Sequence, residues 1–297
     1  MRFDNSEDII QLTPNWLGGR FSNGRPKVPD NILRRFESVT TEEAWGVLWN
    51  HDYKYQFQGD FKTIHPNKIL VGRAVTAVMV PKRPDLDTYL LEYGQKVEGR
   101  HGFFNSWVIE TLVEDDVLVV DLFDKIYEGT YVGGNLSTAV SRRTKRGGQV
   151  IWGGIRDVQQ IMEITDIQTF YRGNDPTGIR DVTLVGMNVP CRIGNAICMP
   201  GDVVLGTPSG VVFVPPHLAE ECCIKAEKVN MRDRFGLLRL REGKYTTAQI
   251  DSLWSTEIWS DFHNWRNDNT PAEYANLDWS EEEADLRSRK LVIEYLG

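Results

Sequence analysis

The stretch MPGDVVLGTPSGVVFVPPHLAEECCIKAEKV, residues 199–229, carries the clearest secondary-structure signals in the chain. A Pro-Gly-Asp turn at 200–202 precedes a run of β-branched residues, and a second turn sequence, TPSG at 207–210, separates that run from VVFVP. Two such runs on either side of a short turn predict a β-hairpin. Pro216 is expected to begin a helix, since a residue at the first helical position needs no N–H partner. The stretch therefore predicts two antiparallel strands followed by a helix.

Strands and helices alternate upstream of this hairpin. From runs of Val and Ile we expect strands at 68–81 (KILVGRAVTAVMVP), 115–123 (DDVLVVDLF) and 149–154 (QVIWGG), and shorter ones at 169–173 and 189–193. Helical spacing predicts helices within 29–51 and 87–112, at 133–146 and at 157–164. Asp30 or Thr41 is expected to cap the helices of the first of these segments, with Glu43 in the first turn after Thr41.

The composition is that of a globular chain with enough apolar residues for a core. Of 297 residues, 41% are hydrophobic and 26% are charged, and the formal net charge is −8. An acidic surface repels phosphate backbones, so nucleic acid is not expected as a ligand. The dense basic run SRRTKRGG at 141–148 lacks interleaved aromatic residues and is interpreted as a solvated helix end.

Membrane and disulfide signals are weak throughout the sequence. No run reaches the roughly 18 apolar residues that a membrane helix needs, and the first residues lack the apolar core of a signal peptide. We therefore expect a cytoplasmic protein with no membrane contact. The cysteines have no CxxC spacing and are expected to be small buried apolar residues: Cys191, Cys198, Cys222 and Cys223.

The two ends of the chain differ in composition from its middle. Residues 1–30 are polar and rich in Gly, Pro and Asn, and we expect an extended arm there. After Tyr245 the sequence becomes rich in tryptophan, and its last part, 280–296, is expected to form a helix with an acidic start. The predicted organisation is an arm at 1–30, a domain at 31–245 and an extension at 246–297.

The loop GGIRD, at 153–157, places a fixed cation beside a fixed anion where a strand ends. Adjacent side chains on a loop usually diverge, so Arg156 and Asp157 should each need a separate partner. The arginine offers a fork that matches a carboxylate, and the aspartate can hold a hard divalent cation. A reaction that passes through an enolate requires this combination. The alternative is structural, with Asp157 capping the following helix and Arg156 in a surface ion pair.

A second glycine-rich junction lies about 20 residues upstream, in VGGNLSTA at 132–139. Gly133 and Gly134 precede a predicted helix, and the backbone N–H groups of Asn135 and Leu136 would form a pocket for an anion. Two such junctions at neighbouring strand ends could converge on one carboxylate-bearing ligand.

These segments, together with VGRAVTA, VLVVD and residues 188–221, occur in the order and spacing of the RraA-like family, which the chain resembles from about Asn31 to Tyr245. That family includes 4-hydroxy-4-methyl-2-oxoglutarate aldolases and regulators of ribonuclease activity, and many members are mislabelled as demethylmenaquinone methyltransferases. The resemblance implies an α/β fold with a β/β/α swivelling-type domain. It also implies a homotrimer or homohexamer with active sites between subunits.

The resemblance further implies a metal-dependent lyase that cleaves pyruvate from a hydroxy-keto-diacid and decarboxylates oxaloacetate, with Mg²⁺ or Mn²⁺ as cofactor. Arg156 corresponds to the arginine that binds the pyruvate unit, and Asp157 to the aspartate that anchors the metal. The amides at Asn135 and Leu136, beside Gly133 and Gly134, correspond to those that hold the substrate carboxylate. A metal-site glutamate from the adjacent subunit's C-terminal helix corresponds loosely to Glu227, with Glu221 as a rival.

One position departs from the family pattern. Aldolase members often carry an acid just after the first glycine of the GGNL loop, where this chain has Gly134, or Asn135 when counted back from Arg156. The upstream acids are candidates to replace it, although each could be a solvated turn residue: Asp121, Asp124 and Glu128. The glycine-flanked His101 is a candidate exposed base, whereas Asp202, His65 and His217 are expected to be structural.

Three functional hypotheses follow. The first is a metal-dependent carbon–carbon lyase acting on a small 2-oxo acid through an enolate. The second keeps the scaffold and the metal but acts on a sugar-derived keto compound, since the acid at Gly134 is missing and tryptophans stack on sugar rings. The third is a non-catalytic binding protein that resembles the ribonuclease regulators.

Overall fold

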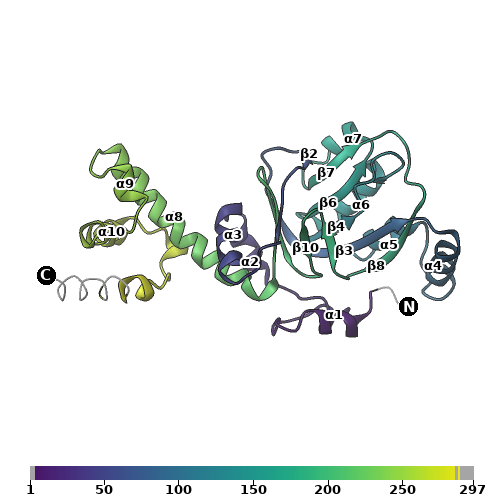
Figure 1. Cartoon of the computed structure of the whole chain (residues 1–297), viewed down its shortest axis with the longest axis horizontal. Coiled ribbons are helices and arrows are strands. Elements are labelled where there is room, and N and C mark those ends of the chain that lie inside the picture. The colour runs from purple at the N-terminus through teal and green to yellow at the C-terminus, as the bar shows by residue number, and fades with distance from the viewer. Residues whose placement is uncertain (1–3, 285–286, 288–297) are drawn as a thin grey trace. The chain divides into compact units, whose positions relative to one another are not determined.

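The computed structural model of the chain describes residues 4–284 and residue 287 (Figure 1). The chain divides into two compact units, Met1–Cys223 and Ile224–Gly297, and the long helix α8 (Ala219–Arg241) contributes to both. The sequence-based boundaries, 1–30, 31–245 and 246–297, remain a prediction. No helix among the described residues is long and apolar enough to span a bilayer.

The first unit is built on a mixed sheet. Its strands follow the order β1-β12-β11-β3-β4-β6-β7-β2, with β5 paired to β6 and β8 paired to β3. A separate ribbon is formed by β9 and β10. The strands are β1 (Phe57–Gln58), β2 (Lys62–Thr63), β3 (Leu70–Pro81), β4 (Asp116–Asp121), β5 (Thr130–Val132), β6 (Gly148–Ile155), β7 (Gln168–Asn174), β8 (Val182–Met187), β9 (Cys191–Ile193), β10 (Ala196–Cys198), β11 (Val203–Thr207) and β12 (Gly210–Val214).

The predicted hairpin is confirmed as β11 and β12, which pair antiparallel from Val203↔Val214 to Thr207↔Gly210. The central strands β3, β4, β6 and β7 run parallel. The helices are α1 (Ser6–Leu12), α2 (Asp30–Phe36), α3 (Thr41–Asn50), α4 (Pro84–Lys96), α5 (Phe104–Ile109), α6 (Gly134–Thr144), α7 (Val158–Met162), α8 (Ala219–Arg241), α9 (Thr247–Ile250) and α10 (Thr256–Asn269), with 3₁₀ turns η1 (Pro216–Leu218) and η2 (Ala272–Tyr274).

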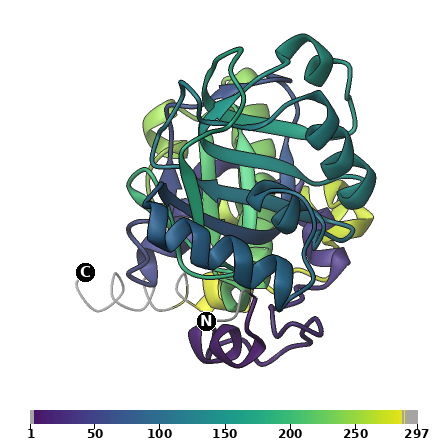
Figure 2. The ribbon, with the colours of Figure 1, turned by 90° about the vertical axis from the view of Figure 1, so that its right-hand side faces the viewer.

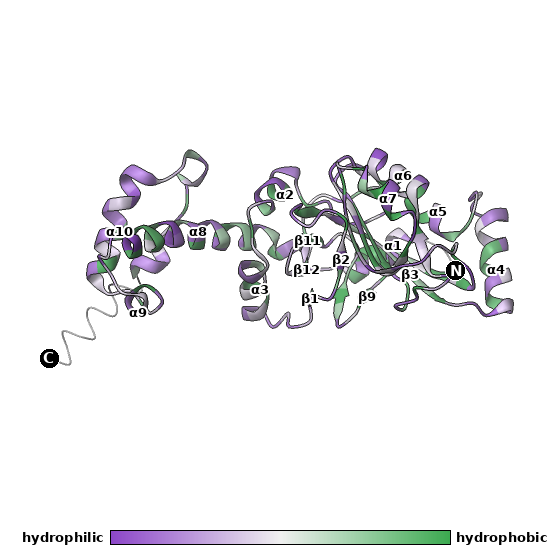
Figure 3. Cartoon of the chain, turned by 90° about the horizontal axis from the view of Figure 1, so that it is seen from above, coloured by the Kyte–Doolittle hydropathy of each residue, from purple (hydrophilic) through white to green (hydrophobic). Residues whose placement is uncertain are grey.

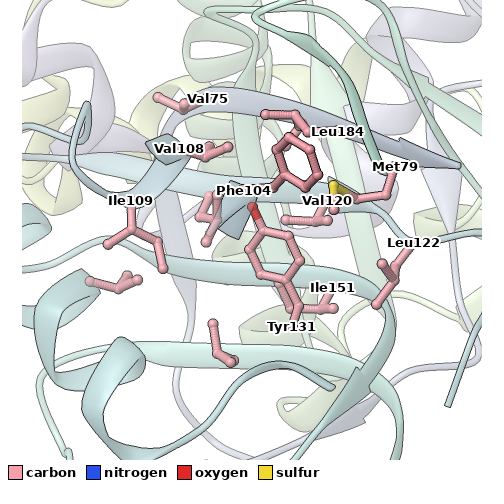
Figure 4. Packing of buried hydrophobic residues seen from close by; sticks show 14 of the residues in the cluster. Val75, Met79, Phe104, Val108, Ile109, Val120, Leu122, Tyr131, Ile151 and Leu184 are labelled. Atoms are coloured by element: carbon pink, nitrogen blue, oxygen red, sulfur yellow. The ribbon is translucent and has the colours of Figure 1, made fainter. Parts of the chain in front are cut away.

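Successive side chains of β4 point to opposite faces of the sheet and pack in two separate hydrophobic cores. Leu118 and Val120 pack in a cluster with residues of α4 to α7, which lie on one face of the sheet (Figure 2). Figure 4 shows part of this cluster, including Phe104 and Ile151. Val117 and Val119 point to the other face, where the β9–β10 ribbon covers them with residues that include Cys191 and Cys198. Figure 3 shows the hydrophobic colour along the strands of the sheet.

The sequence had suggested an extended N-terminal arm. The arm is extended only in part, because it contains helix α1. Its anchor is Arg25, which forms a two-point ion pair with Asp116 of β4, at 2.7 Å and 2.8 Å. The two side chains are only 2% and 0% exposed. The arm is therefore fixed to the sheet by a buried pair of charges.

The capping residue of α3 also differs from the prediction by one position. Thr40, not Thr41, is the N-cap, because the Glu43 N–H donates to its hydroxyl at 3.2 Å and its own N–H donates to the Glu43 carboxylate at 2.8 Å. This is a reciprocal capping box. Asp30 is the first residue of α2 rather than its cap, which is Pro29.

The second unit holds the predicted aromatic-rich helical extension. Its core consists of Met231, Phe235, Tyr245, Trp254, Ile258, Phe262, Tyr274 and Trp279. The Phe262 ring lies 5.4 Å from that of Trp254 and 5.2 Å from that of Trp279. The helix predicted at 280–296 is helical over 280–284 and at Arg287, and its other residues lie outside the described part of the chain.

Candidate functional site

The two glycine-rich junctions meet at one edge of the sheet. Strands β5 and β6 run parallel, with Thr130 opposite Gly154 and Val132 opposite Ile155. Their carboxyl ends therefore lie side by side, and the Arg156 N–H donates to the Val132 carbonyl at 3.0 Å. Helix α6 begins directly after β5, and the Arg156–Asp157 pair follows β6. Strand pairing thus produces the convergence that the sequence suggested.

Asp157 connects the two junctions through its carboxylate. Its backbone is left-handed, with φ 52°, and its Oδ2 accepts the Gly134 N–H at 3.1 Å. The same oxygen lies 3.6 Å from the Arg156 Nε. The expectation that the adjacent side chains diverge is therefore wrong, because the left-handed turn brings the carboxylate back beside the guanidinium. The structural alternative is confirmed in part: Asp157 is the N-cap residue of α7, although its side chain makes no capping bond, and Arg156 lies in an exposed ion pair, with Asp157 itself.

The glycines leave room for this arrangement. A Cβ on Gly133 would lie 2.3 Å from the Asp157 Oδ2 and 2.9 Å from the Arg156 Nε, so a larger residue would displace the pair. A Cβ on Gly134 would lie 2.0 Å from the Gln160 Oε1. The place where family members carry an acid is thus occupied by the Gln160 carboxamide.

The start of α6 offers unused backbone donors. The Gly134 N–H is bonded to Asp157, while no acceptor among the described residues bonds the N–H of Asn135 or Leu136. The helix is 11 residues long, and its dipole favours negative charge at this end.

An open cleft of about 350 Å³ lies beside the pair. Its polar lining comes from the ends of β6 and β7 and from α7: Arg156, Asp157, Gln159, Gln160, Asn174 and Asp175. Arg156 and Asp157 are 46% and 38% exposed, which leaves both accessible to a ligand.

Asp175 is an acid in the cleft that the sequence analysis missed. Its N–H donates to the Ile155 carbonyl at 3.1 Å, which places it beside the end of β6. The Thr177 side chain and the Thr177 N–H, at 2.9 Å, both donate to its carboxylate. These bonds lower the pKa of Asp175 below its ordinary value. The available signal was its position just after β7, the parallel neighbour of β6.

The sequence analysis proposed three acids as replacements for the family acid that is missing at Gly134. In the structure, each of the three bonds or pairs with a group outside the cleft. Asp121 accepts the Phe123 N–H at 2.8 Å, and burial raises its pKa. Asp124 lies 3.1 Å from Arg172, and Glu128 lies 3.8 Å from Arg180. None of the three is among the described residues that line the cleft.

The remaining candidates are spread over the chain. Glu227 is buried on α8 within the second unit, and its role stays a prediction. Its rival Glu221 lies 3.0 Å from His51. His65 lies 3.0 Å from the Ile164 carbonyl oxygen, and the exposed His101 lies outside the cleft lining.

The acids of the cleft suit a partly hydrated divalent cation. Within residues 4–284 and 287, no group of three or more His, Cys, Asp or Glu is placed to hold a metal. Mg²⁺, however, usually keeps several waters and binds one or two carboxylates. Asp157 and Asp175 line the same cleft, and no described donor reaches the Asp157 Oδ1. These two side chains are therefore the carboxylates of the described lining that would hold such an ion.

Solved structures share this fold. Streptomyces coelicolor RraAS2, described as an unusual member of the RNase ES inhibitor RraA family, superposes with a TM-score of 0.60 at 22% identity, over 72% of this chain and 98% of that one. An uncharacterised protein from Pseudomonas syringae gives a TM-score of 0.60 at 20% identity, over 80% of this chain and 99% of that one. The chain is thus an α/β protein with the RraA fold, as predicted.

The sequence comparisons give the family. The model of the RraA-like family, described as Aldolase/RraA, matches residues 41–213. The chain belongs to the RraA-like family, which confirms the resemblance. An uncharacterised protein of Methanocaldococcus jannaschii is 24% identical over 186 residues, 56% of this chain and 88% of that protein. A Halalkalibacterium halodurans protein, provisionally named a 4-hydroxy-4-methyl-2-oxoglutarate aldolase, is 25% identical over 118 residues, 40% of this chain and 55% of its own length.

Proposed function

We propose that the protein is a metal-dependent carbon–carbon lyase that acts on a small 2-oxo acid. The observation that carries the proposal is that Arg156 and Asp157 line one cleft, while the Asp157 carboxylate also accepts the Gly134 N–H at the start of α6. The family includes aldolases, and one relative carries an aldolase name.

In this proposal the residues divide the work of an enolate reaction. The Arg156 fork binds the carboxylate of the 2-oxo acid, and the free N–H groups at Asn135 and Leu136 hold a second carboxylate. Asp157 and Asp175 hold Mg²⁺ or Mn²⁺, which when bound polarises the 2-keto oxygen. In a 4-hydroxy-2-oxo acid, water in the open cleft takes the proton of the C4 hydroxyl, and C4 leaves as the carbonyl carbon of the second product; in oxaloacetate, C4 leaves as CO₂. In both cases the electron pair of the broken C3–C4 bond forms the enolate, whose oxygen would face the Arg156 cation. Protonation at C3 then gives pyruvate.

The assembly implied by this proposal is a homotrimer or homohexamer. Glu227 of the partner subunit would add a carboxylate to the cleft, as the family resemblance implies. Among the described residues of a single chain, Asp157 and Asp175 are the carboxylates in the cleft lining, which is consistent with a ligand supplied from a second subunit.

The test is pyruvate release by the purified full chain. Oxaloacetate and 4-hydroxy-4-methyl-2-oxoglutarate are incubated with Mg²⁺ or Mn²⁺, and pyruvate is measured against a metal-only control, since divalent cations decarboxylate oxaloacetate unaided. We expect enzyme-dependent release that a chelator abolishes and added metal restores. No release above the metal-only rate across the panel would contradict the proposal.

A keto-sugar acid is the second candidate substrate, because Gly134 stands where aldolases often carry an acid. The argument from the tryptophans is weaker, since Trp254 and Trp279 are buried in the aromatic core of the second unit. Adding sugar-derived 2-keto acids to the panel distinguishes the two substrate classes. A ribonuclease-regulator role is favoured only if every acid tested is left intact and a ribonuclease binds the protein.

Gly133→Ala is expected to lower the lyase rate about 10- to 100-fold, by analogy with losses of groups that orient a metal ligand. The new Cβ would meet the Asp157 Oδ2 at 2.3 Å and push the carboxylate from its bond to Gly134. Gly46→Ala is the matched control, because its Cβ would meet no described atom within 4 Å. Equal rates for both variants would show that the close approach at Gly133 has no function.

A further inference from the structure

A second cleft, of about 240 Å³, lies in the first unit between the N-terminal arm and the hairpin. The arm contributes the segment 12–16, just after α1, and the remaining wall includes Ile197, Met199 and Pro215. Its described lining residues do not overlap those of the Arg156 cleft. Residues 12–16 also lie outside the part of the chain that the family model matches, 41–213. One wall of the cleft, residues 12–16, thus lies outside the matched region, whereas Tyr53, Gln56, Ile197, Met199 and Asp202 lie within it.

Two polar side chains in the lining are almost completely buried. Asp202 is 1% exposed, and its Oδ2 accepts the Met199 N–H at 2.8 Å. Gln56 is 4% exposed, and its Nε2 donates to the Phe213 carbonyl at 2.7 Å. No donor among the described residues bonds the Asp202 Oδ1 or the Gln56 Oε1. The cleft therefore presents two acceptor oxygens that no described group of the protein bonds and that a ligand in the cleft can use.

The Asp202 carboxyl makes no ion pair with any described residue. No Lys or Arg is among the described residues that line the cleft. His217 is the basic residue in the described lining, and its Nε2 lies 3.4 Å from the Tyr53 hydroxyl. Burial and the neighbouring His51 lower the pKa of His217, so it is neutral at neutral pH. Burial raises the pKa of Asp202 to about 7, which is the consequence of a carboxylate without a counterion.

The rest of the lining is mainly apolar. Trp16 and Ile197 face the cleft from the arm and from β10, and Pro215 and Pro216 close it beside β12. The volume of about 240 Å³ equals that of about eight water molecules at ~30 Å³ each. A ligand with about eight non-hydrogen atoms and an apolar body matches this space.

We propose that this cleft binds a small organic cation, an ammonium group carried on an apolar ring or short chain. The ammonium donates to the Asp202 Oδ1 and the Gln56 Oε1, and the apolar body packs between Trp16 and the Pro215–Pro216 wall. An anion is disfavoured because both free groups are acceptors and one is acidic. A purely apolar molecule would leave both acceptors unpaired.

The test uses three ligands of one shape on the full chain. Benzylammonium carries the cation, benzyl alcohol is its neutral counterpart and benzoate is the anion. We expect benzylammonium to bind in titration calorimetry and in saturation-transfer NMR, benzyl alcohol to bind at least tenfold more weakly, and benzoate not to bind.

Two variants locate the site. Asp202→Asn keeps an acceptor for the Met199 N–H but removes the charge, and should weaken benzylammonium at least tenfold. Ile197→Trp fills the cleft from a side chain that is 41% exposed, and should abolish binding without unfolding the protein. Thermal melting and pyruvate release, unchanged in Ile197→Trp, separate this result from the proposed lyase activity. Any of three results would overturn the proposal. Benzoate could bind as strongly as benzylammonium, both variants could keep the wild-type affinity for benzylammonium, or benzylammonium could fail to bind at millimolar concentration.

Discussion

Asparagine in place of Asp157 is expected to lower pyruvate release by about three orders of magnitude, equivalent to ~4 kcal/mol of transition-state stabilisation. The substitution is chosen to spare the structure. An asparagine oxygen can still accept the Gly134 N–H that the Asp157 Oδ2 accepts at 3.1 Å, so the link between the two junctions is kept. What is lost is the negative charge toward the divalent cation, and with it the polarisation of the substrate.

Two measurements support the interpretation of this variant. Metal titration should show that Asp157→Asn binds Mn²⁺ more weakly than the wild type does. The control variant should bind Mn²⁺ as the wild type does. Arg180→Lys is the matched control, since Arg180 is 74% exposed and pairs with Glu128, which does not line the cleft. If Asp157→Asn retains the wild-type rate and metal affinity, the assignment of Asp157 to the metal is wrong.

The sequence predicted the strands with the longest apolar runs because their signals are local, but it missed β8 and the short strands β1, β2, β5 and β10. β3, β4, β6 and the β11–β12 hairpin are buried on both faces, so they appear as near-continuous runs of Val, Ile and Leu. The position of the α3 cap was missed by one residue, because Thr40 and Thr41 are both good caps. Only the pairing with Glu43 three residues later favours Thr40.

The site was predicted only in part, because its geometry depends on contacts between strands. The motifs at Gly133, Gly134, Arg156 and Asp157 predicted two junctions that converge, and strand pairing brings them together, while the roles of these residues remain predictions. The left-handed backbone of Asp157, which turns its carboxylate back to Arg156, has no signal in the sequence. Asp175 was missed because it meets Ile155 only once β7 pairs with β6.

Methionine in place of Arg25 is expected to destabilise the first unit by about 3–5 kcal/mol, the usual cost of leaving a buried charge without its partner. The Arg25–Asp116 pair is nearly inaccessible, at 2% and 0% exposure, and closes with two hydrogen bonds. Without the guanidinium, the Val113 N–H, at 2.9 Å, is the one hydrogen-bond donor that the described residues leave to the Asp116 carboxylate. Urea unfolding of the variant and the wild type measures the difference.

The loss in the free energy of unfolding of Arg25→Met should increase with pH. Burial already raises the pKa of Asp116, with Arg25 opposing the shift, and removing Arg25 raises this pKa further. The folded variant therefore holds a proton on Asp116 that the unfolded chain loses above its ordinary pKa of about 4. The deficit in the free energy of unfolding should be smallest near pH 4 and grow as the pH rises to 8.

The double variant Arg25→Met/Asp116→Asn should recover most of the lost free energy of unfolding, because the asparagine oxygen can still accept the Val113 N–H. Arg83→Met, at a pair that is 76% and 67% exposed, should cost under ~1 kcal/mol. Equal costs for Arg25→Met and Arg83→Met would mean that the buried pair does not anchor the arm.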